Sequence, residues 1–163
     1  MKKFIVTCML VILGIGASAQ THQGQSSFGV NLGYGFSDHS NVVFGLDYRY
    51  NFTDEIRLAP SFSYFVKENG LSACAVDVNA HYVIPLNDVL GFYPLAGLDL
   101  SFWNWKIENG LQYHENYTRF GVNLGLGAEV YATDQLTVGL EFRYNLIKDF
   151  DQAILGVRIG YNF

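Results

Sequence analysis

Ten ionisable side chains recur at alternating positions along the chain, and they are the first candidates for chemistry. Carboxylates and guanidinium groups at such spacing form ion pairs, line a charged path or carry out acid–base steps. The five acids and five arginines are Asp47, Arg49, Arg57, Asp77, Asp99, Arg119, Glu129, Glu141, Arg143 and Arg158. Because the two signs balance, we expect a hydrogen-bonded charge network wherever these groups converge away from water. Glu141 and Arg158 are expected to be able to pair directly across neighbouring strands.

The sequence gives less evidence for a catalytic nucleophile or a metal site than for a charge network. Of the four histidines, His22, His39, His81 and His114, His39 stands directly before a serine, Ser40. Adjacent residues of a strand face opposite ways, so that pair does not predict a Ser–His site. No cluster has metal-ligand spacing, and the glycines follow strand alternation rather than a phosphate-binding loop. We therefore predict no catalytic residue, no metal site and no cofactor.

The elements that carry these side chains have a period of two residues. Apolar and polar residues alternate strictly, which is typical of strands with one face apolar. Short turn-type segments between them alternate with longer ones, as in up-and-down barrels. The eight alternating runs cover residues 28–36, 44–52, 56–64, 74–84, 92–102, 120–130, 136–144 and 155–163.

The distribution of charge decides which face of such a barrel meets water. All ten ionisable strand residues lie on the polar side of the alternation, whereas Lys67, Lys106 and Lys148 fall in long loops. Twelve of the 17 glycines share the polar side. A soluble barrel carries its charges outward, but a membrane barrel cannot, since Arg or Lys on the lipid face costs roughly 2–4 kcal/mol at mid-bilayer. The pattern therefore predicts a polar interior, crowded with glycine, inside an apolar outer wall.

Aromatic residues support this orientation. They collect near both ends of the strands, as in the interfacial girdles of membrane barrels. Near the short turns these residues are Tyr50, Phe52, Tyr82, Phe92, Tyr161 and Phe163, and near the long loops they are Phe36, Tyr64, Phe102, Phe120 and Tyr144.

The first residues have the features of an export signal. Lys2 and Lys3 precede an apolar run over 4–15 and the small residues Ala17-Ser18-Ala19. We predict a signal peptide over 1–19 and a barrel domain over 20–163. Among the 163 residues, 50% are hydrophobic and only 15% are charged, with a net charge of −5. A nucleic-acid partner is excluded on this basis, because phosphate binding needs clustered Lys and Arg.

The whole predicted barrel domain resembles the small eight-stranded outer-membrane β-barrel family of the OmpA-transmembrane and OmpX type. Its last residues resemble the terminal-strand signal read by the barrel-assembly machinery, with Ile159, Tyr161 and Phe163 at every second position. The resemblance implies an all-β fold, an eight-stranded antiparallel up-and-down transmembrane β-barrel in the cell outer membrane. It implies contacts with outer-membrane lipid, lipopolysaccharide and the assembly machinery. The chain ends at the eighth run, so a peptidoglycan-binding domain is not expected.

Three functions remain open at this point. The first is a non-enzymatic structural or surface-interaction role through short extracellular loops, with an extracellular protein ligand that the sequence does not name. The second is a narrow channel for small solutes, which is less favoured because side chains fill the interior of an eight-stranded barrel. The third is a lipid A-modifying enzyme, since such enzymes are built on similar barrels.

The longest loop, 102–117, is the candidate surface-binding segment. It holds Trp103, Trp105, Tyr113 and Tyr117, and Asn109-Gly110 is a hairpin signal. We expect the two flanking strands to continue as a ribbon beyond the membrane. A two-residue turn would mismatch their faces, so a three-residue loop or a bulge is predicted. The alternative interpretation is that these aromatics complete the outer girdle and contact lipopolysaccharide headgroups.

Overall fold

The structure is a computed structural model that describes residues 22–163 apart from 38–40, 69–70, 110 and 148–150. Side chains are described for the same residues except those of 67–72 and 104–117. The predicted signal peptide over 1–19 lies outside the described residues. Within the described part, no helix is long and apolar enough to cross a membrane.

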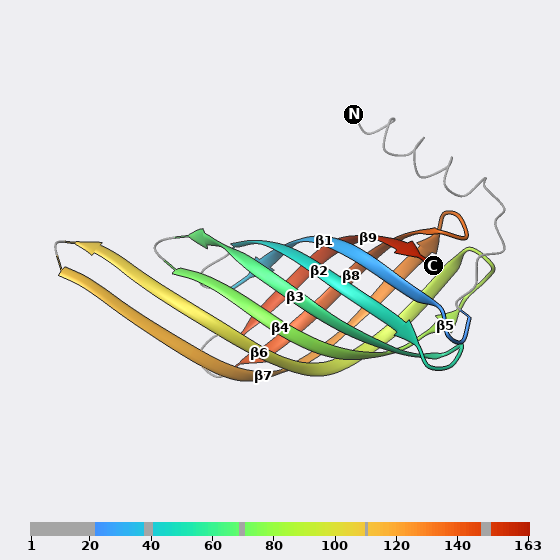
Figure 1. The fold of residues 1–163 in the computed structure, drawn as a ribbon, viewed down its shortest axis with the longest axis horizontal. Coiled ribbons are helices and arrows are strands. Elements are labelled where there is room, and N and C mark those ends of the chain that lie inside the picture. Colours follow the sequence, from blue (N-terminus) through green and yellow to red (C-terminus); the bar gives the residue numbers. More distant parts are fainter. Residues whose placement is uncertain (1–21, 38–40, 69–70, 110, 148–150) are drawn as a thin grey trace, which may run out of the picture.

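Nine strand segments make up the fold, and their order along the chain is also their order around the sheet (Figure 1). They are β1 (Ser26–Phe36), β2 (Asn41–Asn51), β3 (Ile56–Glu68), β4 (Leu71–Tyr82), β5 (Ile84–Pro85), β6 (Leu90–Asn109), β7 (Leu111–Tyr131), β8 (Leu136–Ile147) and β9 (Gln152–Asn162).

The sheet closes into a barrel, which confirms the predicted fold class. Every described pairing is antiparallel, β1 pairs with β9, and β4 pairs with β6. The two-residue β5 also pairs with β6, so β4 and β5 are one barrel strand interrupted at Val83. At this interruption Val83 N donates to Glu55 O in the preceding turn, at 2.6 Å. The nine segments therefore form eight barrel strands, which agrees with the eight alternating runs of the sequence.

The barrel is polar inside and apolar outside, because alternate residues of each strand face opposite ways. Leu98, Leu140 and Val157 face outward and are 54%, 52% and 48% exposed. Asp77 and Asn123 face inward and are fully buried. The predicted aromatic residues also face outward near both ends, among them Phe52 and Tyr161 near the short turns and Phe36 and Phe120 near the long loops. This arrangement suits a lipid environment and would be unfavourable in water.

Three short turns at one end of the barrel have the same hydrogen-bond pattern, which was not predicted from the sequence. In each, a Thr or Asn side-chain oxygen accepts hydrogen bonds from the backbone N–H groups two and three residues on. The acceptors are Thr53, Asn87 and Thr133, with distances of 2.8–3.2 Å. The five-residue segments are 52–56 (FTDEI), 86–90 (LNDVL) and 132–136 (ATDQL). This repeated turn fixes three hairpins in the same way.

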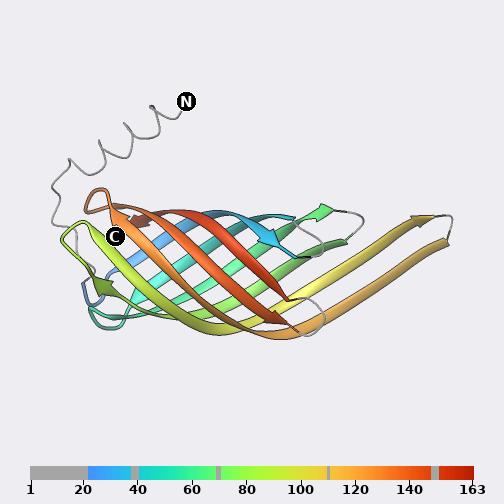
Figure 2. The same ribbon diagram turned by 180° about the vertical axis from the view of Figure 1, so that it is seen from behind.

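At the opposite end β6 and β7 extend well beyond the other strands (Figures 1 and 2). They pair continuously from Leu90↔Val130 to Asn109↔Leu111 without a register shift. The prediction of a ribbon is confirmed, and its same-parity register excludes a two-residue turn at Asn109-Gly110. We call this extension, residues 104–117, the ribbon, and the two ends of the barrel the short-turn end and the ribbon end.

Candidate functional site: the charged interior and the ribbon

Arg158 on β9 binds across the neighbouring strand to Asp47 on β2. Its Nε and Nη2 lie 2.9 and 2.8 Å from the Asp47 carboxylate, and Nη2 also donates to Ser27 Oγ at 3.2 Å. Glycines make this reach possible, because a Cβ at Gly29 or at Gly160 would overlap the Arg158 guanidinium. The crowding of glycine on the polar face therefore gives room for long inward side chains.

Glu129 on β7 is the anchor of a second group of ion pairs nearer the short-turn end. Its carboxylate accepts from Arg57 Nη1 at 2.7 Å and from Arg49 Nη1 at 3.0 Å. Arg49 also contacts Asp47 at 3.3 Å and Glu141 at 3.2 Å. The five residues are linked into one network with Arg158, through side chains that are almost entirely buried except for Glu141.

Tyr93 on β6 lies at the centre of this network, and the sequence analysis did not select it. Its ring lies 4.8 Å from the Arg57 guanidinium carbon and stacks on His81 at 4.6 Å. Its hydroxyl donates to Glu141 at 2.9 Å and accepts from Arg49 at 3.2 Å. A Cβ at Gly127 would overlap the ring, so this glycine admits it. The alternation could have identified it, because odd-numbered residues of this strand, such as Asp99, face inward.

A third group lies nearer the ribbon end, around Asp77 on β4. Its carboxylate accepts from Asn123 Nδ2 at 2.8 Å and from Arg143 Nη1 at 3.4 Å. Ser61 and Ser63 donate to it at 3.3 and 3.5 Å. Asp99 on β6 stands directly opposite Asp77 in the register and is 1% exposed.

The predicted pair of Glu141 and Arg158 is wrong. In the β8–β9 register Glu141 stands opposite Gly156, whereas Arg158 stands opposite Gly139. Glu141 instead pairs with Arg49, and Arg158 with Asp47, because both arginines extend across the lumen rather than along one pair of strands. Arg119, the last of the ten residues, is half-buried on β7, and its backbone O accepts from Ser101 Oγ at 3.4 Å.

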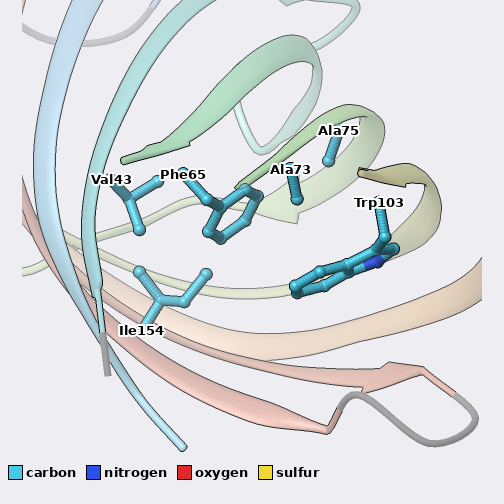
Figure 3. Close-up of a cluster of buried hydrophobic side chains, with 6 residues drawn as sticks. All are labelled: Val43, Phe65, Ala73, Ala75, Trp103 and Ile154. Atoms are coloured by element: carbon cyan, nitrogen blue, oxygen red, sulfur yellow. The ribbon is translucent and has the colours of Figure 1, made fainter. Parts of the chain in front are cut away.

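Apolar side chains close the interior at the ribbon end (Figure 3). We call this cluster the plug, and its members are Val43, Phe65, Ala73, Ala75, Trp103 and Ile154. The rings of Phe65 and Trp103 stack at 6.0 Å, and Trp103 Nε1 donates to Ser101 Oγ at 3.0 Å. Each member is at most 5% exposed.

The plug corrects one part of the surface-loop prediction. Trp103 was expected on the exposed segment, but its indole points into the barrel and is 5% exposed. Residue 103 has the inward parity of β6, which continues the alternation past the predicted end of that run. The side chains of Trp105, Tyr113 and Tyr117 lie outside the described residues, although their backbones belong to β6 and β7.

Two cavities lined by described residues are small. One cavity of about 50 Å³ lies among Asp47, Arg49, Glu141 and Arg143, and a second of about 10 Å³ lies at the short-turn end beside Gln25 and Arg158. The larger cavity has room for a few water molecules, and neither has room for a metabolite. Among the described residues, no three His, Cys, Asp or Glu side chains form a group that could hold a metal ion.

The histidines are scattered. His81 is buried against Tyr93, His22 is exposed near the N-terminal end of the described chain, His39 lies outside the described residues, and the His114 side chain is also outside them. In the described part of the chain His81 Nδ1 is hydrogen-bonded to the Arg57 guanidinium at 3.2–3.3 Å and to no hydroxyl group.

The terminal strand completes the barrel wall. Ile159, Tyr161 and Phe163 face outward and are 52%, 53% and 69% exposed. Phe163 N donates to Ser26 O at 2.9 Å, and Ser26 N donates to Phe163 O at 3.2 Å. Ile159 and Tyr161 thus lie on the outer face of β9, which closes the barrel against β1, and Phe163 directly follows this strand.

Comparisons with known proteins agree with this geometry. A family model described as outer membrane protein beta-barrel domain matches residues 7–163. No curated protein has a sequence that matches this chain.

Solved structures show the same fold. The N-terminal β-barrel domain of Pseudomonas aeruginosa OprF has a TM-score of 0.67 at 19% identity, covering 86% of this chain and 98% of that one. Ail, the attachment invasion locus protein of Yersinia pestis, has a TM-score of 0.64 at 19% identity, with 86% and 99% covered. Neisserial surface protein A has a TM-score of 0.65 at 12% identity, with 85% and 94% covered.

Proposed function

Because this chain belongs to the outer membrane protein beta-barrel domain family and resides in the outer membrane, we propose that it is a non-enzymatic surface protein whose ribbon contacts extracellular partners. The barrel serves as a rigid membrane anchor. Its short turns face the periplasm and its ribbon faces outward.

The ribbon is the observation that carries the proposal. β6 and β7 have 20 and 21 residues, whereas the neighbouring β4 and β8 have 12 each. Pairing of β7 with β8 ends at Gly121↔Ile147, but its pairing with β6 continues to Leu111. A two-stranded arm is thereby projected from a closed cylinder. Trp105, Tyr113 and Tyr117 belong to that arm, and Trp and Tyr are residue types enriched at protein interfaces.

The interior supports an anchoring role rather than transport. The network of Arg49, Arg57, Glu129 and Tyr93 crosses the lumen, and the plug covers the ribbon end. Buried ion pairs of this kind are costly to break. In planar bilayers we expect no steady conductance from the wild-type barrel, and a large stable pore would favour the channel function instead.

Ail is named an attachment invasion locus protein and has also been solved with a heparin analogue, sucrose octasulfate. A role in surface contact is thus compatible with this barrel type.

Shortening the ribbon tests the proposal. One variant replaces residues 105–115 with a three-residue glycine-containing turn, which keeps the parity and retains Trp103. A control keeps the whole ribbon and replaces Glu55, exposed in a turn at the opposite end of the barrel, with Gln. Adhesion of cells displaying each protein is measured on epithelial layers and on heparin-coated plates. We expect the short variant to lose adhesion and the control to keep it, with equal amounts of folded barrel.

Equal adhesion of the wild type, the short variant and cells without the protein would contradict the surface-contact role. A change in lipid A acylation, measured by mass spectrometry when the gene is expressed, would contradict the non-enzymatic role.

A further inference from the structure

Asp77 and Asp99 form an acidic pair inside the barrel that the ion-pair network does not balance. They stand directly opposite one another on β4 and β6, both inward, with exposures of 0% and 1%. Side chains directly opposite in an antiparallel pair have Cβ atoms about 4.5–5.5 Å apart, and like charges at this position are destabilising. Two ionised carboxylates here would repel each other out of contact with bulk water.

The hydrogen bonds of the two carboxyl groups are strongly unequal. Asp77 accepts from Asn123, Arg143, Ser61 and Ser63, which is the environment of an ionised carboxylate. In contrast, neither carboxyl oxygen of Asp99 accepts a hydrogen bond from any residue that the structure describes. A charged group buried without a partner is among the costliest features a fold can contain.

The surrounding charges do not remove this imbalance. Arg143 on β8 is the cation bonded to Asp77. Arg119 on β7 lies two residues from Gly121, which stands opposite Asp99, and is half-buried, but no described hydrogen bond joins it to the Asp99 carboxyl group. Glu141 on β8 is engaged by Arg49 and Tyr93, and β3 presents only the two serines to Asp77. The layer thus holds two carboxyl groups and one bonded cation.

We propose that the Asp77–Asp99 pair holds a single proton at neutral pH, with Asp99 as the neutral acid that donates a hydrogen bond to the Asp77 carboxylate. One proton removes the repulsion and supplies the partner that Asp99 lacks, since a protonated carboxyl group gains an O–H donor. The unbalanced negative charge of the layer then disappears.

The plug keeps this pair away from water on the ribbon side. Ala75 precedes Asp77 by two residues on the same face, and Ser101 follows Asp99 by two; they are 1% and 0% exposed. Trp103 and Phe65 stack beyond them. The proton is therefore built into the closed interior, and folding of the barrel takes up a proton from solution.

The consequence is a dependence of stability on pH. Above about pH 4 an aspartate in the unfolded chain is ionised, so the unfolded state binds fewer protons than the barrel. Stability then falls as pH rises. Removing the proton-binding carboxyl group removes this contribution while leaving the others in place.

Asp99→Asn tests the proposal, because its amide has the shape of the neutral acid and keeps a donor. Urea unfolding of wild type and variant in lipid vesicles is compared between pH 5 and 9. We expect the ratio of their unfolding constants to change by up to tenfold per pH unit, with the variant favoured at high pH. Asp77→Asn should unfold more easily throughout, because Arg143 then lacks its carboxylate. Parallel pH profiles for the wild type and Asp99→Asn would overturn the proposal.

Infrared spectroscopy gives a readout that does not depend on refolding a variant. The wild type at pH 7 should show the carbonyl band of a protonated carboxylic acid, and Asp99→Asn should lack it. Absence of that band in the wild type would contradict the proposal. Exchange of sodium for N-methylglucamine at constant ionic strength separates a proton from a metal ion. Stability should be unchanged, and a loss confined to the wild type would assign the site to a metal cation instead.

Discussion

Arg158 reaches Asp47 over the backbone of β1, a strand that carries glycine where the arginine passes. The two residues lie 111 positions apart in the sequence and two strands apart in the barrel. The guanidinium lies where a side chain at Gly29 would have to go. The charged residues and the glycines of the polar face therefore pack together: the glycines leave the space that the long arginine side chains occupy.

Gly29→Ala should therefore destabilise the barrel. The added Cβ would lie 2.5 Å from Arg158 Nε, which Asp47 and Ser27 hold in place. We expect a loss of about 1–3 kcal/mol, the usual range for overpacking, measured by urea unfolding in vesicles. Gly139→Ala is the matched control, because its Cβ would have only ordinary contacts from 3.4 Å outward. Equal stability of the two variants would show that the arginine moves aside freely.

Glu129→Gln should strongly destabilise the barrel. It would leave Arg49 and Arg57 without their shared carboxylate in a buried position. Loss of one partner from a buried ion pair costs about 3–5 kcal/mol. Glu55→Gln in an exposed turn is the control and should change stability by less than about 0.5 kcal/mol. Chemical unfolding followed by circular dichroism measures both, and a loss below about 1 kcal/mol in Glu129→Gln would contradict this role.

Thr133→Ala should weaken the β7–β8 turn. The Thr133 hydroxyl oxygen accepts from Gln135 N at 3.2 Å and from Leu136 N at 2.9 Å. We expect a loss of about 1 kcal/mol, the typical net value of a hydrogen bond. Thr133→Ser retains the oxygen and should stay close to the wild type. If Ser and Ala had the same effect, the methyl group rather than the hydrogen bonds would be responsible.

Trp103 should be shielded from solvent despite its position beside the ribbon. In a Trp105→Phe background it is the only tryptophan, and its ring is stacked on Phe65 inside the barrel. We expect acrylamide to quench its fluorescence several-fold less than that of a free indole, because the quencher must contact the ring. Phe65→Ala should raise the quenching by opening the plug. Full quenching in the folded wild type would place the indole outside.

The two-residue alternation was sufficient to predict the barrel, since each strand needs only a consistent inner and outer face. It could not predict which interior side chains meet. The register sets Glu141 beside Gly156, and the length of an arginine then allows contact two strands away. Neither effect is local in the sequence, so the expected Glu141–Arg158 pair was wrong.

Apolar residues on the inner face were missed for a different reason. Phe65 and Trp103 contradict the rule that inward positions are polar, because the rule describes the charged middle of the lumen and not its ribbon end. Tyr93 was missed because aromatic residues were assigned to the outer girdles. Parity alone would have placed all three inside, whatever their polarity.

Backbone hydrogen bonds between Ser26 and Phe163 hold the first and last strands side by side, so the closed barrel does not depend on which strand comes first in the chain. Joining these neighbours by a short linker and opening the chain at the exposed Asp88 turn would leave each strand beside its present partners. The same wall could then be assembled from a circularly permuted gene whose last segment is no longer the one that ends in Phe163. A permuted protein would therefore separate two roles of the last strand: pairing with β1 in the closed barrel, and the predicted signal for assembly in the membrane.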